Sequence, residues 1–257
     1  MSFSFATWNI LATAYIRPEW YPRTPPHLLD PTWRVPALVR HALALDVDIL
    51  CLQEVEADVF AALRDGLAPQ GYSGRFATKG ANRPDGCATF FRADRFALLD
   101  DRRLAYADGS GHVAQILQFR FRQEDRELAI ANTHLKWDPP GAPRERQWGY
   151  GQVVQALGAL NSPHARILCG DLNAKPESDV VSALLAAGFD YTHRGLPETR
   201  TCNSNAEPKL IDYVFYGGAL RADPLPVPLI DAETPLPSHE QPSDHLPLTA
   251  RFAWLEV

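Results

Sequence analysis

Residues 166–176, with the sequence RILCGDLNAKP, contain the strand end around which the rest of the chain is arranged. The apolar first half predicts a buried strand, and Pro176 is expected to open the next helix. Because side chains alternate along an extended chain, Asp171 and Asn173 are predicted on one face at the rim of a sheet, with Leu172 turned away. A carboxylate and an amide aimed at one point suit a phosphate group, although both residue types also occur in ordinary strand-to-helix turns.

Length, charge and cysteine content restrict the class of protein. The 257 residues suit one domain spanning 1–257, and a net charge of −6 argues against a general nucleic-acid coat without excluding a nuclease whose acidic pocket binds cations. Four cysteines without Cys-x-x-Cys spacing predict reduced thiols and no zinc framework. The chain begins with a strand pattern and not a signal peptide, and no apolar run reaches membrane-spanning length. A cytoplasmic monomer without membrane contact is therefore predicted.

Apolar periodicity predicts two packed sheets with helices outside them, a fold of the α/β class. Residues 16–36 contain six prolines, which predicts an ordered excursion without a helix interior. The predicted helices lie around 38–45, 60–67, 144–160 and 178–187. The predicted strands lie around 3–9, 48–54, 72–76, 87–91, 98–105, 113–121, 128–133, 166–170, 210–216 and the segment ending at 254.

Polar residues follow the apolar runs at six strand ends. They are Asn9, Glu54, His134, Asp171 with Asn173, Asp212, and Asp244 with His245. Most of them alone have an ordinary explanation as turn residues, helix-capping residues or a near-core histidine. Asp212 is harder to explain, because a carboxylate inside an apolar strand is costly unless it is paired or metal-bound. The joint occurrence of all six indicates a shared site.

The acidic members of this set supply what metal-assisted phosphate hydrolysis requires. Oxygen ligands suit Mg²⁺, or Mn²⁺ in its place, and such an ion keeps several waters for the substrate. Glu54 is predicted as the first ligand, with Asp171 or Asp244 near the same or a second ion. Asp171 can also orient or deprotonate the attacking water. Zn²⁺ fits less well, since the sequence has no His-x-x-x-His or cysteine cluster.

The other members supply hydrogen-bonding and acid–base groups for the same reaction. Asn9, Asn173 and His134 can donate hydrogen bonds to oxygens that gain charge in the transition state. Asp212 is predicted to pair with His245, so that the carboxylate fixes the tautomer and favours the protonated ring. The protonated ring would then face the phosphate.

Six motifs together resemble the endonuclease/exonuclease/phosphatase superfamily, in that family's order and over nearly the whole chain. They are Trp8-Asn9-Ile10, Leu52-Gln53-Glu54, Thr133-His134-Leu135, Gly170-Asp171-Leu172-Asn173, Ile211-Asp212-Tyr213 and Ser243-Asp244-His245. The resemblance implies a DNase I-like four-layer α/β sandwich, with two central mixed β-sheets flanked by helices. It also implies one Mg²⁺-dependent site at the edge that the sheets share.

Four further segments resemble the deadenylase, nocturnin and Angel branch of that superfamily. They are residues 53–56, 85–88, 134–139 and 211–216, and residues 201–204 are most similar to Angel proteins. Members of this branch act as 3′→5′ exoribonucleases on poly(A), as 2′,3′-cyclic phosphatases on RNA ends, or as nicotinamide-dinucleotide 2′-phosphatases. Pro139 matches a proline that packs on the substrate base in the deadenylases. Their stacking phenylalanine has no counterpart here, where Glu207 or its neighbours stand, so a strong adenine preference is not expected.

The sequence therefore predicts a Mg²⁺-dependent phosphoesterase that hydrolyses phosphodiester or phosphomonoester bonds in RNA or at RNA 3′ ends. The residues predicted to bind substrate are Lys136, Pro139, Arg144 and Asn173, with Arg200 and Lys209 as further candidates for contacts to backbone phosphates. Solvated surface charge is the ordinary explanation for the basic residues. A phosphatase for a small nucleotide or a phospholipid headgroup needs only the pocket and stays open. A binding module without catalysis fits less well, because every catalytic-type position is filled.

Overall fold

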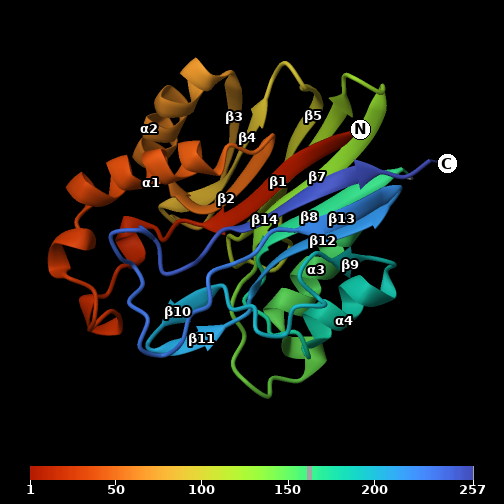
Figure 1. Ribbon diagram of the computed structural model, residues 1–257. Helices are drawn as coiled ribbons and strands as arrows, with labels where there is room; N and C mark the ends of the chain where they lie inside the picture. Colours follow the sequence, from red (N-terminus) through yellow and green to blue (C-terminus); the bar gives the residue numbers. More distant parts are fainter. Residues whose placement is uncertain (161–163, 257) are drawn as a thin grey trace.

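Two mixed β-sheets pack face to face at the centre of the computed structural model, which describes residues 1–160 and 164–256. The first sheet has six strands in the order β13-β14-β1-β2-β4-β3, and the second has six in the order β5-β6-β7-β8-β12-β9. A pair of helices covers the outer face of each sheet, which makes four layers (Figure 1). The predicted four-layer α/β sandwich is confirmed.

The bounds of the elements follow the sheet order. The first sheet contains β1 (Ser2–Asn9), β2 (Ile49–Glu56), β3 (Tyr72–Thr78), β4 (Asp85–Arg92), β13 (Leu220–Pro224) and β14 (Leu248–Trp254). The second contains β5 (Phe96–Ala105), β6 (Val113–Phe121), β7 (Arg126–His134), β8 (Ala165–Asp171), β9 (Asp190–Tyr191) and β12 (Asp212–Gly218). A separate hairpin consists of β10 (Cys202–Ser204) and β11 (Glu207–Lys209). The helices are α1 (Pro31–Leu45), α2 (Ala57–Leu67), α3 (Trp148–Ala159) and α4 (Asp179–Ala186). None of these described helices is long and apolar enough to cross a membrane.

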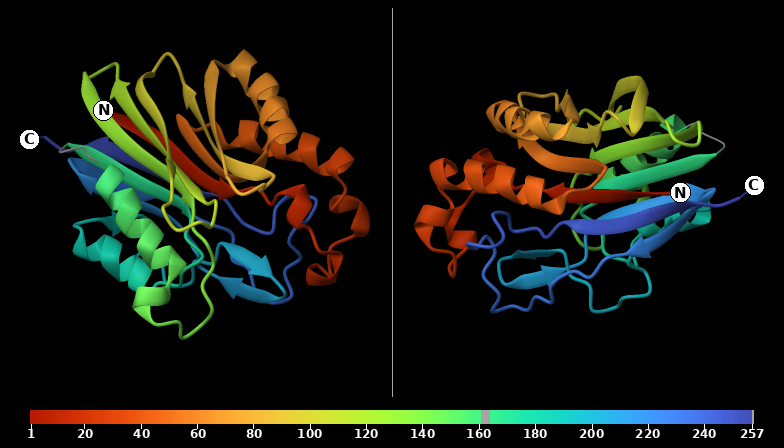
Figure 2. Two further views of the ribbon diagram at one scale, coloured as in Figure 1. Left: turned by 180° about the vertical axis from the view of Figure 1, so that it is seen from behind. Right: turned by 45° about the horizontal axis from the view of Figure 1, so that its top comes forward.

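Three hydrophobic clusters hold the four layers together. The cluster between the sheets is rich in aromatic rings, among them Phe3 of the first sheet and Phe119 of the second. Leu63 of α2 packs on the outer face of the first sheet, and Val153 of α3 and Leu184 of α4 pack on that of the second. Each such side chain contributes roughly 1.5–3 kcal/mol when it is fully buried. Figure 2 shows the two helix pairs on opposite sides of the sheets.

The end of the proline-rich excursion differs from its prediction. Helix α1 begins at Pro31 and includes Pro36, so the expectation of no helix interior was wrong for residues 31–36. Pro31 occupies the first helical position, where an N–H has no partner within the helix, and the Asp30 side chain caps the helix. Pro36 cannot donate to the Thr32 carbonyl, but both residues are exposed, so water can bond that carbonyl instead.

Two predicted helix starts lie too early, and four short strands were missed. Residues 144–146 form a 3₁₀ turn, and α3 begins only at Trp148. Helix α4 begins at Asp179 and not at Pro176, because the Ser178 side chain caps it by accepting a hydrogen bond from the Val181 N–H. Strands β9 and β13 and the β10–β11 hairpin escaped prediction because short polar strands lack a clear alternation of apolar residues.

Gly170 lies where β8 passes close to β7. Its φ is +130°, and a Cβ there would lie 1.8 Å from the Thr133 carbonyl oxygen. Gly170→Ala is therefore expected to lower the free energy of unfolding by about 3 kcal/mol or more, measured by urea denaturation. Gly158→Ala is the matched control, because Gly158 lies in α3 with nothing within 4 Å of its Cβ position and should gain up to ~1 kcal/mol. Equal stability of the two variants would contradict the close-packing argument.

Candidate active site

The polar residues that follow the apolar runs meet at one edge of the two sheets. Asn9, His134 and Asp171 are the last residues of β1, β7 and β8. Asp212 opens β12, which is antiparallel to β8, and it lies directly opposite Asp171. The ends of both sheets therefore place their side chains together. We call Asn9, Glu54, His134, Asp171, Asn173, Asp212 and His245 the strand-end cluster.

Asn9 joins carboxylates from the two sheets. Its side-chain Nδ2 donates to Glu54 Oε1 at 3.0 Å and to Asp171 Oδ2 at 2.9 Å, while its Oδ1 accepts from the Leu11 N–H at 3.0 Å. The amide orientation follows from these partners, since only the NH₂ side can donate to two carboxylates. Asn9 thus holds two negative groups side by side, and it is fully buried while it does so.

Glu54 reaches the cluster through an irregularity in β2. The pairing of β2 with β4 shifts register between Leu52 and Val55, and Glu54 has a φ of +58°. A bulge of this kind changes the direction of a side chain near a functional site. The second carboxylate oxygen, Oε2, accepts from the Ala12 N–H at 2.8 Å, which fixes the group at both oxygens.

Asp171 and Asn173 do come together, but simple alternation along a strand is not the reason. Strand β8 ends at Asp171, and Asn173 has a left-handed φ of +50°. The Asn173 N–H donates to Asp171 Oδ1 at 2.8 Å, an Asx-type turn that fixes the carboxylate. Asn173 Nδ2 then lies 3.0 Å from His134 Nε2, while Leu172 packs in the outer core, as predicted.

Asp212 and His245 form the predicted carboxylate–imidazole pair. His245 Nδ1 lies 2.9 Å from Asp212 Oδ2, which also accepts from the Thr201 hydroxyl at 2.6 Å. Burial disfavours a charged ring, but the charge of Asp212, helped by Cys202 and Asp244, raises the pKa of His245 well above its usual value. The other ring nitrogen of His245, Nε2, points into the cluster and lies 3.8 Å from Asp171 Oδ2.

His134 is the neutral histidine of the cluster. Burial and the nearby charge of Lys79 lower the pKa of His134 well below its usual value. Its Nδ1 lies 3.8 Å from Glu54 Oε1 and its Nε2 lies 3.6 Å from Asp171 Oδ2. The two histidines thus have opposite protonation preferences within one site, a pattern that assigns them different tasks.

Lys79 belongs to the site and was missed by the sequence analysis. Its Nζ lies 2.7 Å from Asp85 Oδ2 and 3.3 Å from His134 Nδ1, and only 1% of its side chain is exposed. Asp85 Oδ1 accepts from the Tyr15 hydroxyl at 2.7 Å. Lys79 comes just after β3 in a polar connection, where a lysine ordinarily indicates a solvated surface. The resemblance of residues 85–88 to the deadenylase, nocturnin and Angel branch bears on Asp85, but no signal in the sequence bears on Lys79.

The Lys79–Asp85 pair gives a prediction for stability. Lys79→Met should cost roughly 3–5 kcal/mol of unfolding free energy, because it leaves the Asp85 carboxylate buried without its cation. The double variant Lys79→Met/Asp85→Asn should recover part of that loss, since the amide can still accept from Tyr15. Denaturant titrations of the wild type, both single variants and the double variant measure this cycle. Additive losses would show that the two groups do not interact.

Asp244, predicted as a metal ligand, lies beside the cluster. Its Oδ2 accepts from the Tyr21 hydroxyl at 3.0 Å, and its Oδ1 is buried with no hydrogen-bond partner in the described residues. Among the described residues it groups with Cys202 and His245, whereas Glu54, His134 and Asp171 form a separate group whose ligand atoms lie within 4.8 Å of one another. Its role as a ligand stays a prediction.

The chemistry of the donors fits a hard divalent cation near Glu54 and Asp171. Burial raises the pKa of Glu54, and burial together with the charge of Asp212 raises the pKa of Asp171 to about 7. Neighbouring buried carboxylates are compensated when a cation binds between them. Asp212 Oδ1 and Asp244 Oδ1 are also buried without a hydrogen-bond partner in the described chain, so the site has more acceptors than donors.

The residues predicted to bind substrate divide into two groups. Asn173 lies inside the strand-end cluster. Lys136 places its Nζ 3.5 Å from the centre of the Trp148 ring, and Arg144 pairs with Asp179 at 2.6 Å. Pro139 is exposed in the loop between them. The roles of Lys136, Pro139 and Arg144 therefore stay predictions, and the two cations already have partners within the chain.

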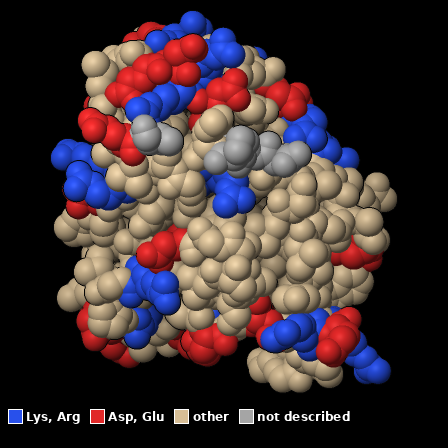
Figure 3. Space-filling view, turned by 90° about the vertical axis from the view of Figure 1, so that its right-hand side faces the viewer, with Lys and Arg blue, Asp and Glu red and all other residues tan. Residues whose placement is uncertain are grey.

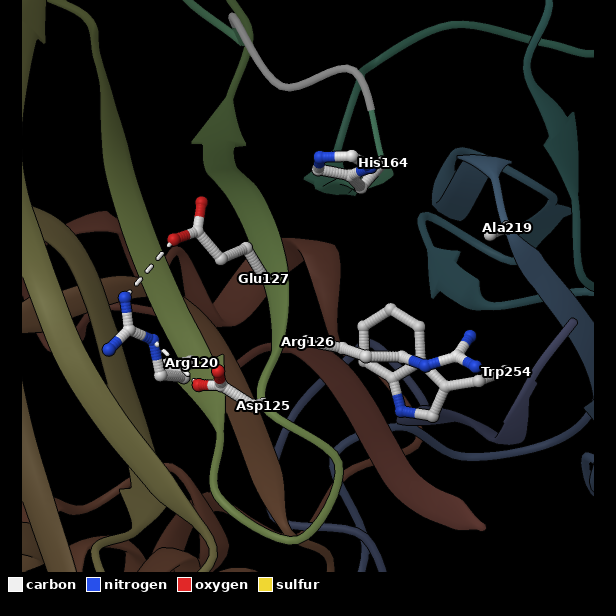
Figure 4. A pocket seen from close by; sticks show the side chains of 7 residues that line it. All are labelled: Arg120, Asp125, Arg126, Glu127, His164, Ala219 and Trp254. Atoms are coloured by element: carbon white, nitrogen blue, oxygen red, sulfur yellow. Dashed lines mark hydrogen bonds and ion pairs between the residues drawn. The ribbon is translucent and has the colours of Figure 1, made fainter. Parts of the chain in front are cut away.

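A separate pocket lies at the other ends of the same strands. It measures about 480 Å³, and its lining includes Arg120, Asp125, Glu127 and Trp254 but no member of the strand-end cluster (Figure 4). Arg120 pairs with Asp125 at 3.3 Å and with Glu127 at 3.4 Å. Acidic and basic side chains are interspersed on the face that carries both termini (Figure 3). Since these charges pair with one another, the pocket lacks the concentration of one charge that the strand-end cluster has.

Comparison with known proteins places this geometry in context. The model of the endonuclease/exonuclease/phosphatase family matches residues 6–245. The chain is 27% identical to 2′,5′-phosphodiesterase 12 of Bos taurus, over 96% of this chain and 51% of that protein. It is 25% identical to the CCR4-Not complex 3′-5′-exoribonuclease subunit Ccr4 of Candida albicans, over 76% of this chain and 30% of that protein. It is 28% identical to protein angel homolog 2 of Mus musculus, over 74% and 38%. The chain thus spans about half or less of the length of these relatives.

Two solved structures are also similar. ANGEL2, described as a 2′,3′-cyclic phosphatase in complex with adenosine-2′,3′-vanadate, superimposes with a TM-score of 0.85 at 23% identity, covering 98% of this chain and 95% of that one. The human Nocturnin catalytic domain with bound sulfate gives 0.78 at 26% identity, covering 98% and 93%. The resemblance to the deadenylase, nocturnin and Angel branch is confirmed by these relatives and structures.

Proposed function

Because this chain belongs to the endonuclease/exonuclease/phosphatase family, we propose that it is a Mg²⁺-dependent phosphoesterase acting on RNA 3′ ends. The observation that carries the proposal is the convergence of two carboxylates and two histidines at one sheet edge. The relatives support RNA as the substrate, since they are named as a 3′-5′-exoribonuclease subunit and as 2′,5′-phosphodiesterase 12. ANGEL2, described as a 2′,3′-cyclic phosphatase, supports an RNA end through the shared fold.

The metal in this proposal is held by Glu54 together with Asp171 or Asp244. When bound, a divalent cation neutralises phosphate charge and stabilises the leaving oxygen. Mn²⁺ is expected to substitute for Mg²⁺, because the same oxygen ligands suit both. Asn9 keeps Glu54 and Asp171 together through its two hydrogen bonds, so it acts on the reaction by positioning them.

The proton-transfer step is assigned to Asp171. Its Oδ1 accepts from the Asn173 N–H, and its Oδ2 faces both histidine rings, so one carboxylate is fixed where water and phosphate must meet. Asp171 orients the attacking water and accepts its proton. His245, protonated through Asp212, donates from Nε2 to a phosphate oxygen that gains charge in the transition state.

Three further donors surround the expected phosphate position. Asn173 Nδ2 and the His134 ring lie on one side of Asp171, and Lys79 lies behind His134. Lys79 adds a positive charge that is buried and therefore weakly screened by solvent. We propose that Asn173 and His134 bind the non-bridging oxygens of the substrate phosphate, and that Lys79 supports them with its buried charge and does not contact the phosphate.

The test uses three RNAs of one sequence that end in a 3′-hydroxyl, a 3′-phosphate or a 2′,3′-cyclic phosphate. Each is incubated with Mg²⁺ or Mn²⁺, and the products are resolved on a denaturing gel beside an Asp171→Ala control. A ladder shortening from the 3′ end identifies an exoribonuclease. Loss of the terminal group alone identifies an end-processing phosphatase. If all three RNAs persist, RNA as the substrate is wrong, and small nucleotides are assayed next.

A further inference from the structure

A second pocket is lined by chain segments that flank two residues of the strand-end cluster. It measures about 460 Å³ and lies between the segment after β8, the segment after β9 and strand β11. Lys175 lines it two residues after Asn173, and Leu210 lines it two residues before Asp212. The two chain segments that carry Asn173 and Asp212 therefore also contribute residues to the wall of this pocket.

The lining of this pocket is strongly basic. Lys175, Arg194, Arg200 and Lys209 contribute four positive side chains, and Glu177 is the one acidic residue among the lining residues that the structure describes. The chain as a whole carries a net charge of −6. A concentration of positive charge against that background attracts polyanions to this place. We call the pocket the basic groove.

Arg200 is prepared to bind a phosphate. Its Nη1 donates to the backbone carbonyls of Pro197 and Thr199, both at 2.8 Å. Its Nε and Nη2 donate no hydrogen bond within the part of the chain that the structure describes. A guanidinium that is fixed on one side and open on the other suits an incoming phosphate. The next residue, Thr201, bonds Asp212, which links this loop to the cluster.

Glu207 competes for the same cations. Its carboxylate lies 3.0 Å from Lys209 Nζ and 3.8 Å from Lys175 Nζ. The Glu207 and Lys175 side chains are more than half exposed, so this pairing is weak and can be exchanged. The Glu207 carboxylate therefore occupies the position between the two ammonium groups that a non-bridging phosphate oxygen would take.

We infer that the basic groove binds the phosphodiester backbone next to the reacting RNA end, and that Glu207 weakens this binding by occupying Lys175 and Lys209. The inference rests on the proposed function for the identity of the strand. Because the groove would bind backbone phosphates beyond the reacting end, the enzyme should prefer a single-stranded oligonucleotide to a mononucleotide. A ribose 2′,3′-cyclic phosphate alone would fill the cluster and leave the groove empty.

The test measures binding separately from turnover. An eight-nucleotide single-stranded RNA, labelled at its 5′ end, is titrated in Ca²⁺ by fluorescence anisotropy with the wild type and four variants. Arg200→Gln and Lys209→Gln should each weaken binding by roughly fivefold and lower the slope of log affinity against log salt by about 0.7. Glu207→Gln should strengthen binding. Arg120→Gln, at the far pocket, should change nothing. Opposite effects from neighbouring substitutions exclude a general loss of folding.

Turnover in Mg²⁺ provides the second readout. For the groove variants, KM for the oligonucleotide should change while kcat/KM for a nucleoside 2′,3′-cyclic phosphate stays within about twofold of wild type. If the groove variants bind RNA as the wild type does, or if Glu207→Gln weakens binding, the groove inference is wrong. If the groove variants change binding but the wild type cleaves neither substrate, the proposed function fails while the groove inference stands.

Discussion

Replacing Glu54 by glutamine should lower Mg²⁺-dependent turnover of RNA ends by roughly 10³-fold, because a metal ion supplies several kcal/mol of transition-state stabilisation. The substitution keeps the shape of the side chain, and the amide oxygen can still accept from the Ala12 N–H. It removes the negative charge beside Asp171 and also the hydrogen bond from Asn9 Nδ2, because the amide NH₂ group then faces that donor. The loss should therefore appear in metal affinity and in kcat, and the folded structure should remain.

The measurement is kcat as a function of Mg²⁺ concentration, together with calorimetric titration of Mn²⁺ into the RNA-free protein. Glu127→Gln is the matched control, since Glu127 lies near the start of β7, at the opposite end of that strand from His134, and its partners are the exposed Arg120 and the half-buried Gln118. It should retain wild-type turnover. A Glu54→Gln variant that binds Mn²⁺ and turns over normally would remove Glu54 from the metal site. A variant that unfolds at lower urea concentrations would identify a structural role instead.

The positions of Asn9, Glu54, His134 and Asp171 were predictable because each follows a recognisable apolar run. Asp212 instead opens β12, and His245 precedes β14. Polar residues that follow buried strands lie at the edge of a sheet. The resemblance over six motifs implied that the edges of the two sheets meet at one site. The means by which they converge was not predictable. Glu54 reaches the cluster through a register shift in β2, and Asn173 through a left-handed backbone conformation. Neither feature can be predicted from the alternation of apolar and polar residues along a strand.

Lys79 shows a different limit of sequence-based prediction. A lysine in a polar connection between strands is normally solvated, and nothing local distinguishes this one. Its burial depends on Asp85 and His134, which come from β4 and β7, so the contact arises only when both sheets are in place. Glu207 is a similar case. The sequence analysis noted it only as standing where the deadenylases have a stacking phenylalanine, and the structure shows that its carboxylate pairs with Lys175 and Lys209.

Asp212→Asn should lower kcat by roughly 10²–10⁴-fold, the range of a general acid–base contribution, while KM for RNA changes little. The asparagine can still accept from the Thr201 hydroxyl, but it carries no charge. The charge of Asp212 raises the pKa of His245 against the effect of burial, so removing that charge should lower the pKa and favour the neutral ring. A neutral ring cannot donate from Nδ1 and Nε2 together, so the phosphate loses a charged donor.

Ring ¹⁵N chemical shifts of His245 at pH 7 separate this explanation from a structural one. The wild type should show an imidazolium and Asp212→Asn a neutral ring, with kcat falling in parallel. Asp190→Asn, on the neighbouring strand β9, is the control. Its carboxylate contacts the exposed Arg194 and the Tyr191 N–H, so the substitution should leave both readouts unchanged. If His245 stays protonated in Asp212→Asn while kcat falls, the carboxylate acts by orienting the ring and not by charging it. If KM alone changes, the pair belongs to substrate binding, and the assignment of His245 as the charged donor is wrong.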